Sequence, residues 1–142
     1  MSELAHLMLE YDTGTKSAAS PIELARRAAD GDFDYEVLAW LQDGFRHHVD
    51  GGADLEKALR LDRVSRMRER DDALRVAAGL LTLGSADAWP VAGRLAQAVA
   101  RHKRMRGEPV TLLEKTMAKA FDCGVGVPSG QRQLYRIINP LD

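Results

Sequence analysis

The chain has 142 residues, of which 45% are hydrophobic and 29% are charged, and these values exclude a globally disordered protein. The single cysteine excludes a scaffold held together by disulfides. The sequence has neither a signal-peptide pattern nor an apolar run long enough to cross a membrane. We therefore expect a cytoplasmic protein with no membrane partner. The net charge of −1 hides an asymmetry, since residues 1–55 hold 11 acidic and 4 basic residues whereas residues 56–142 hold 10 acidic and 16 basic residues.

The N-terminal stretch divides into two short pieces. Residues 2–11 have apolar side chains at helical spacing and predict a short helix. Residues 12–19 are small and polar, which is typical of a linker. We therefore expect residues 1–19 to form an N-terminal arm that is free to move.

Two well-marked helices follow the arm. Ser20 and Glu23 form a capping-box pattern around Pro21, which predicts a helix from Pro21 to about Asp30. Asp34 then caps a helix to about Val49. The apolar positions of this second helix recur at helical spacing and predict its core-facing side. They are Val37, Leu38, Leu41, Phe45 and Val49, with Trp40 adding bulk.

Three further helices are predicted in the middle of the chain. A short one covers 55–61, a long one runs from Asp62 to about Leu83, and a third runs from Ser85 or Asp87 to about Arg106. The long helix carries Arg63, Arg66 and Arg70 on one face. In the next helix Arg94, Gln97, Arg101 and Arg104 share a face, while His102 lies on the apolar stripe and is expected to be packed.

The last part of the chain predicts two helices. Thr111 and Glu114 form a second capping box, which opens a helix to about Asp122. Residues 129–138 predict a short final helix. Because no convincing strand is present, we expect an all-α fold, with residues 20–142 forming one compact bundle of six to seven helices.

Residues 111–138 resemble a helix-turn-helix. A helix with the small residue Ala120 is followed by Gly124, by a turn, and by a second helix that Ser129 could cap. The stretch Ser-Gly-Gln-Arg-Gln-Leu-Tyr-Arg-Ile-Ile is similar to the recognition helix of many bacterial regulators, which lies in the major groove. The connecting stretch is about two residues longer than the usual tight turn. The alternative is an ordinary helical hairpin that closes the bundle.

The resemblance and the basic cluster at 101–106 together predict a DNA interface. Arginine can make two hydrogen bonds to guanine and glutamine can do so to adenine, while closely spaced cations favour phosphate contacts. The predicted DNA-binding residues are Arg101, Lys103, Arg104, Arg106, Ser129, Gln131, Arg132, Gln133 and Arg136.

Neither a metal site nor catalytic chemistry is indicated. Asp43 and His47 stand four residues apart on one helix face, but two ligands do not make a site, and Cys123 has no neighbouring thiol or histidine. The glycine-rich stretch 124–130 lacks a lysine and follows a helix, so it does not fit a phosphate loop. We therefore expect no enzyme, no metal and no cofactor.

Two hypotheses from different classes remain. The first is a small bacterial or phage regulatory protein that binds duplex DNA through the basic second part. The second is a non-catalytic interaction module, such as a phage or mobile-element accessory protein, whose acidic first part binds and inhibits a host protein complex. A homodimer is compatible with both hypotheses, since operators commonly have two half-sites.

Overall fold

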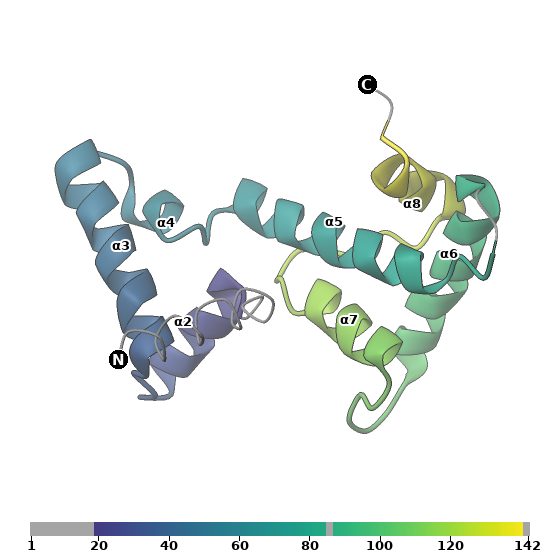
Figure 1. Ribbon diagram of the computed structural model, residues 1–142, viewed down its shortest axis with the longest axis horizontal. Coiled ribbons are helices and arrows are strands. Elements are labelled where there is room, and N and C mark those ends of the chain that lie inside the picture. The colour runs from purple at the N-terminus through teal and green to yellow at the C-terminus, as the bar shows by residue number, and fades with distance from the viewer. Residues whose placement is uncertain (1–18, 85–86, 141–142) are drawn as a thin grey trace, which may run out of the picture. The chain divides into compact units, whose positions relative to one another are not determined.

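The computed structural model describes residues 19–84 and 87–140 (Figure 1). These residues contain helices and no strand, so the prediction of an all-α fold is confirmed. The helices are α2 (Pro21–Ala29), α3 (Tyr35–Gly51), α4 (Leu55–Ala58), α5 (Arg63–Leu80), α6 (Ala88–Arg104), α7 (Leu112–Phe121) and α8 (Gln131–Ile138). The helix predicted at 2–11 and the arm that contains it lie outside the described residues, except for Ala19. Within the described ranges, no helix combines the length and the apolar character needed to cross a bilayer.

The chain divides into two compact units, residues 1–62 and residues 63–142. The charge asymmetry follows the same boundary. The first unit has 13 acidic and 6 basic residues, a net charge of −7, and the second has 8 acidic and 14 basic residues, a net charge of +6. Each unit has its own buried apolar cluster. The prediction that residues 20–142 form one domain stays a prediction.

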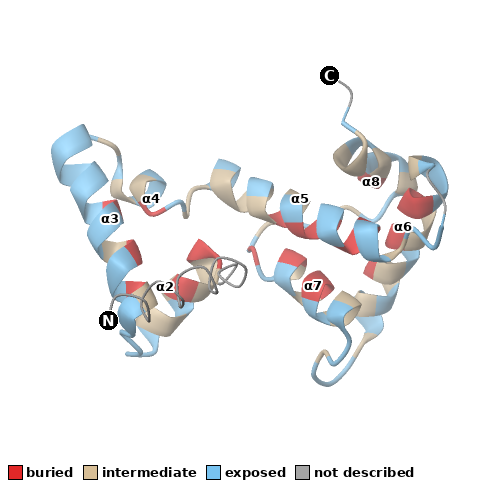
Figure 2. Cartoon of the chain, viewed as in Figure 1, coloured by how far each residue is buried: buried red, intermediate tan, exposed pale blue. Residues whose placement is uncertain are grey.

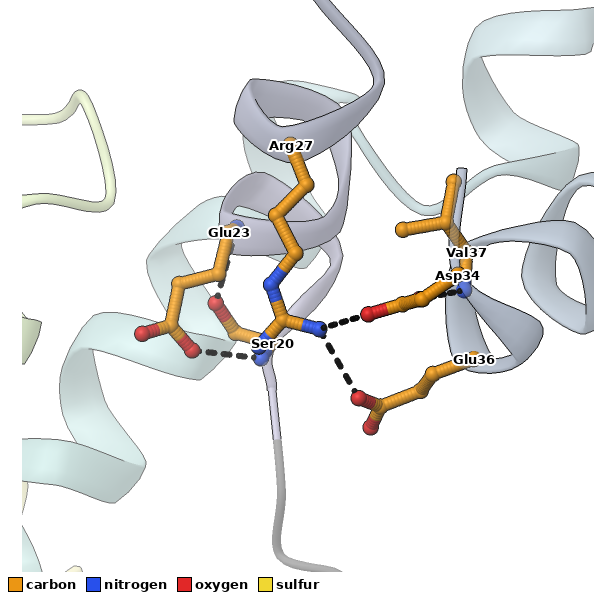
Figure 3. Close-up of polar contacts among 6 residues, drawn as sticks. All are labelled: Ser20, Glu23, Arg27, Asp34, Glu36 and Val37. Carbon is orange, nitrogen blue, oxygen red and sulfur yellow. Dashed lines mark hydrogen bonds and ion pairs between the residues drawn. The ribbon is translucent and has the colours of Figure 1, made fainter. Parts of the chain in front are cut away.

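Two side-chain caps begin α2 and α3 of the first unit as predicted, whereas Asp54 at the start of α4 makes no side-chain cap bond (Figure 3). The Ser20 hydroxyl accepts from the Glu23 backbone N–H at 3.3 Å, and the Glu23 carboxylate accepts from the Ser20 N–H at 2.9 Å. The Asp34 carboxylate accepts from the Val37 N–H at 2.9 Å. Arg27 of α2 then joins the two helices, since its guanidinium lies 3.3 Å from Asp34 and 2.9 Å from Glu36.

The core of the first unit forms where α3 meets α2 and α4. Leu24, Val37, Trp40 and Leu59 are buried together, and the Trp40 indole N–H donates to the Leu59 carbonyl at 3.1 Å. Gly44 is also buried, and a side chain there would collide with Leu59. The glycine therefore lets α4 approach α3 closely.

The predicted core face of α3 is only partly right. Val37 and Trp40 are buried, whereas Leu38, Phe45 and Val49 are exposed. The physical reason is the close contact at Gly44, which turns that face of the helix toward Leu59 and leaves the wider apolar stripe outside.

The second unit packs α7 and α8 against α5 and α6, with α5 in contact with α6, α7 and α8. Figure 2 shows the buried positions of α5, α6 and α7 gathered along their facing sides. The largest fully buried side chains here are Leu74, Leu95, Met117 and Leu134, one from each helix. This shared cluster fixes how α6 and α8 present their polar faces.

Two arginines of the face predicted on α5, Arg66 and Arg70, make contacts within the second unit. Arg70 is buried, donates to the Gly126 carbonyl at 2.7 Å and pairs with Asp71 at 2.7 Å. Arg66 lies against Gly124, where an added Cβ would meet its guanidinium. These two arginines therefore hold the connection between α7 and α8 against α5 and are not a free phosphate-binding surface.

Candidate nucleic-acid interface

The basic cluster lies at the C-terminal end of α6 and in the loop after it. Arg101, Lys103, Arg104 and Arg106 are all exposed. Within the ranges that the structure describes, the side chains of Lys103, Arg104 and Arg106 make no hydrogen bond or ion pair. A cation at a helix C-terminus is stabilised by the helix dipole, which favours Arg101, Lys103 and Arg104 in the last turn of α6.

A cleft of about 690 Å³ adjoins this cluster, between α6, the start of α7 and the end of α5. Its polar lining comes mainly from the face of α6 that the sequence predicts, which confirms that these positions share one side of the helix. The members of that face are Arg94, Gln97, Arg101 and Arg104. The apolar lining comes from Leu81, Ala98, Met105, Leu113 and Met117. The cleft is therefore apolar inside and mostly cationic at its polar edge.

Arg94 serves the fold as well as the cleft. Its guanidinium donates to the carbonyls of Leu81 and Thr82 at 2.8 and 3.1 Å, just beyond the last turn of α5. These carbonyls belong to a helix end, where backbone acceptors lack intrahelical partners. The guanidinium of Arg94 is thus bonded to the backbone at the end of α5, and the cationic groups available to a ligand are those near the end of α6.

Glu114 is the acidic residue of the cleft, and its carboxylate caps the N-terminal end of α7. The carboxylate accepts from the backbone N–H groups of Val110 at 2.8 Å and Thr111 at 3.2 Å, and the Thr111 hydroxyl accepts from the Glu114 N–H at 3.1 Å. These backbone bonds, first Val110 and then Thr111, hold the pKa of Glu114 below its ordinary value, with smaller contributions from the charges of Arg101 and His102. The predicted capping box is confirmed, and the carboxylate offsets part of the Arg101 charge.

His102 is packed, as the sequence predicts. Its ring stacks on Phe121 with centroids 4.5 Å apart and planes inclined by 27°. The Nδ1 atom is buried and makes no hydrogen bond to a described residue. The residue therefore anchors α6 against α7, beneath the basic cluster.

Two of the residues predicted at or near α8 differ from the prediction. Gln131 donates its amide N–H to the Trp89 carbonyl at 3.0 Å and covers Gly93 of α6, so it is not a free base-reading side chain. Ser129 does not cap α8, because the cap position is Gly130 and no side chain bonds there. Ser129, Arg132, Gln133 and Arg136 are exposed.

The arrangement of α7 and α8 also differs from a helix-turn-helix. Nine residues, Asp122 to Gly130, separate the two helices, whereas the motif joins its helices by three or four residues. α7 packs mainly on α5, and α8 packs mainly on α6 (Figure 1). Arg70 holds this connection along α5 through the Gly126 carbonyl, and Arg66 lies against it at Gly124. The helices themselves are present as predicted, but they do not form the tight crossing pair.

The nine predicted DNA-binding residues fall into two separate groups. Gln131 of α8 contacts α6 at Gly93, which lies 11 residues before Arg104, or about 16 Å along the helix axis. In Figure 1 the loop after α6 and helix α8 lie at opposite ends of the second unit. The basic cluster and the exposed face of α8 are thus two cationic patches on one unit.

The remaining titratable groups of interest do not form a reactive site. Burial raises the pKa of the Cys123 thiol to about 11, so the thiolate is scarce at neutral pH. Asp43 and His47 do share a helix face, 3.7 Å apart, as predicted. Among the residues described, no three His, Cys, Asp or Glu side chains gather as metal ligands would.

Comparisons with known protein families, with curated proteins and with solved structures found no match for this chain.

Proposed function

We propose that this protein binds nucleic acid through the phosphate backbone, using the basic cluster Arg101, Lys103, Arg104 and Arg106 of the second unit. The observation that carries the proposal is that all four cations are exposed and that three of them, Lys103, Arg104 and Arg106, have no side-chain partner among the described residues. Neutralising phosphates with such side chains releases condensed counterions, which favours binding without regard to base sequence.

The electrostatics of the whole unit support the same proposal. Residues 63–142 hold 14 basic and 8 acidic residues, and such an excess of positive charge attracts a polyanion over about one Debye length. Arg132 and Arg136, one turn apart on the exposed side of α8, form a second patch that can contact a neighbouring phosphate. The regulatory role expected from the sequence thus rests on phosphate contacts rather than on a helix-turn-helix.

Fluorescence anisotropy on random and genomic DNA duplexes tests the proposal. We expect binding that weakens steeply as salt is raised, and Arg104→Ala should weaken binding to all sequences alike. The log–log salt dependence should become shallower by about one for each phosphate contact that is lost. Lys57→Ala, which removes an exposed cation from the acidic first unit, is the matched control and should change little.

Two results would count against the proposal. Absence of binding at tens of micromolar protein and low salt would overturn it, because counterion release is strongest there. Equal loss of affinity in Arg104→Ala and Lys57→Ala would show that the effect follows net charge and not the basic cluster.

A second candidate function, a non-catalytic module that binds a host protein complex, is supported by the charge of the first unit. Its 13 acidic and 6 basic residues suit a basic surface on a partner. Affinity capture from a bacterial lysate with and without nuclease separates the two functions. Material that disappears with nuclease supports nucleic acid, and a protein retained after nuclease supports the interaction module.

A further inference from the structure

The cleft beside α6 is large enough and apolar enough to hold a small molecule. Its volume of about 690 Å³ lies within the range of ligand pockets, about 300–1,000 Å³. Leu81, Met105 and Leu113 line its interior, and the core of the second unit buries these side chains only in part. Apolar surface is therefore left in contact with water, and an apolar occupant that covers it gains free energy.

The charged side chains of the cleft give it a positive balance. Three arginines and one carboxylate line it, a net charge of +2 when His102 is counted as neutral. The arginines are Arg94, Arg101 and Arg104, and the carboxylate is Glu114. Arg94 is bonded to the backbone after α5, and Glu114 is bonded to backbone N–H groups at the start of α7. The charges that can meet an occupant are therefore mainly those of Arg101 and Arg104.

The positions of Arg101 and Arg104 suit a single anionic group. They stand three residues apart on α6, both are exposed, and both line the cleft. Residues at this spacing are neighbours on one helix face. Within the described part of the chain, the side chain of Arg104 makes no hydrogen bond or ion pair. A guanidinium binds a carboxylate through two parallel N–H donors, which gives the contact direction as well as strength.

We infer that this cleft binds a small amphipathic anion, namely an aliphatic carboxylate. Its chain lies against Leu81, Leu113 and Met117, and its carboxylate lies at Arg101 and Arg104. The apolar lining favours the chain and the arginines favour the charge. An alcohol of the same chain length lacks the ion pair, and an inorganic anion lacks the apolar contact, so each should bind more weakly.

The inferred ligand shares two cations with the basic cluster. Arg101 and Arg104 line the cleft and also belong to the four residues proposed above to contact phosphates. A carboxylate bound there neutralises charge that a phosphate would otherwise meet, so the two ligands compete. This competition rests on the proposed function, whereas binding of the carboxylate itself does not.

NMR of the full chain with carbon-13 in the methionine methyl groups tests the inference, with decanoate as the probe. Met105 and Met117 line the cleft, whereas Met67 of α5 does not. We expect saturable shifts of the Met105 and Met117 signals at submillimolar decanoate, with the Met67 signal unchanged. Decan-1-ol should bind several-fold more weakly, because it lacks the negative charge.

Two pairs of variants test the apolar and the charged parts separately. Leu113→Ala should weaken decanoate binding by about fivefold or more, since apolar contact is lost. Leu112→Ala is its control, because Leu112 is 64% exposed and lies outside the lining. Arg104→Ala should weaken binding several-fold, whereas Lys115→Ala, which removes an exposed cation outside the lining, should change little. Circular dichroism checks that each variant is folded.

Several results would overturn the inference. They are the absence of shifts at Met105 and Met117, equal shifts at Met67, and decan-1-ol binding as tightly as decanoate. These titrations contain no nucleic acid, so their outcome is independent of the proposed function. In fluorescence anisotropy, decanoate should displace a labelled duplex at concentrations where decan-1-ol does not. A duplex that stays bound when decanoate saturates the cleft overturns the competition.

Discussion

The position of α8 depends on one fully buried side chain, Leu134. Its side chain has no exposed surface, and it belongs to the core cluster shared with Leu74 and Leu95. Leu134→Ala removes this contact and leaves a cavity that the surrounding helices fill only in part. Substitutions of this kind cost 2–5 kcal/mol, and we expect about 3 kcal/mol here because the site is completely enclosed.

The two tryptophans allow this loss to be assigned to one unit. Trp40 is buried in the first unit, whereas Trp89 lies in the second and its ring makes an edge contact with Tyr135 of α8, with centroids 5.5 Å apart. In a Trp40→Phe background, Trp89 alone reports unfolding. Urea titration should show a lower midpoint in Leu134→Ala with an unchanged slope, relative to Trp40→Phe itself.

A control on the same helix sharpens the comparison. Gln133 is exposed, so Gln133→Ala in the same background should change the free energy of unfolding by less than about 0.5 kcal/mol. If Leu134→Ala costs less than about 1 kcal/mol, the reasoning that α8 is held in place by this side chain is refuted.

Two further predictions concern buried charge and pH. Arg70→Met leaves the Gly126 carbonyl and the Asp71 carboxylate without their partner. Thermal unfolding should therefore show that the free energy of unfolding falls by about 3 kcal/mol. An unchanged melting temperature would contradict this role of Arg70. The pKa of Glu114 is lowered on folding, so its stabilising effect is present above its ordinary pKa of 4.5 and is lost as pH falls through the lower folded value. Thermal melts across that acidic range should therefore show a pH dependence that Glu114→Gln reduces, and an identical dependence in the variant would exclude this carboxyl as the cause.

Several elements of this protein could be predicted from the sequence because their causes are local. The capping boxes at Ser20 and Thr111 and the cap at Asp34 each join groups three residues apart, so the pattern alone contains the interaction. Within the described ranges, the helices predicted from residue 20 onward appear within a few residues of their expected ends. The shared basic face of α6 was also predictable, because helical periodicity alone places Arg94, Arg101 and neighbouring positions on one side.

Other features depend on contacts between residues far apart in the sequence. Sequence reasoning missed the exposed stripe of α3 because Leu38, Phe45 and Val49 have the spacing of a core face. A signal was present nonetheless, since Val37 and Trp40 place a second apolar face on the same helix.

The sequence by itself determined the described helices, the caps at Ser20, Asp34 and Thr111 and the sign of the charge on each half of the chain, because each follows from residues close together along the chain or from composition. Tertiary structure decided which apolar face of α3 is buried, through the approach of Leu59 to Gly44. It decided that Gln131 bonds to α6 and that Arg70 holds the connection after α7. It also left the basic cluster at the end of α6 exposed, with no ion pair between a described acidic residue and Lys103, Arg104 or Arg106. These outcomes depend on packing between distant segments, which local patterns do not contain.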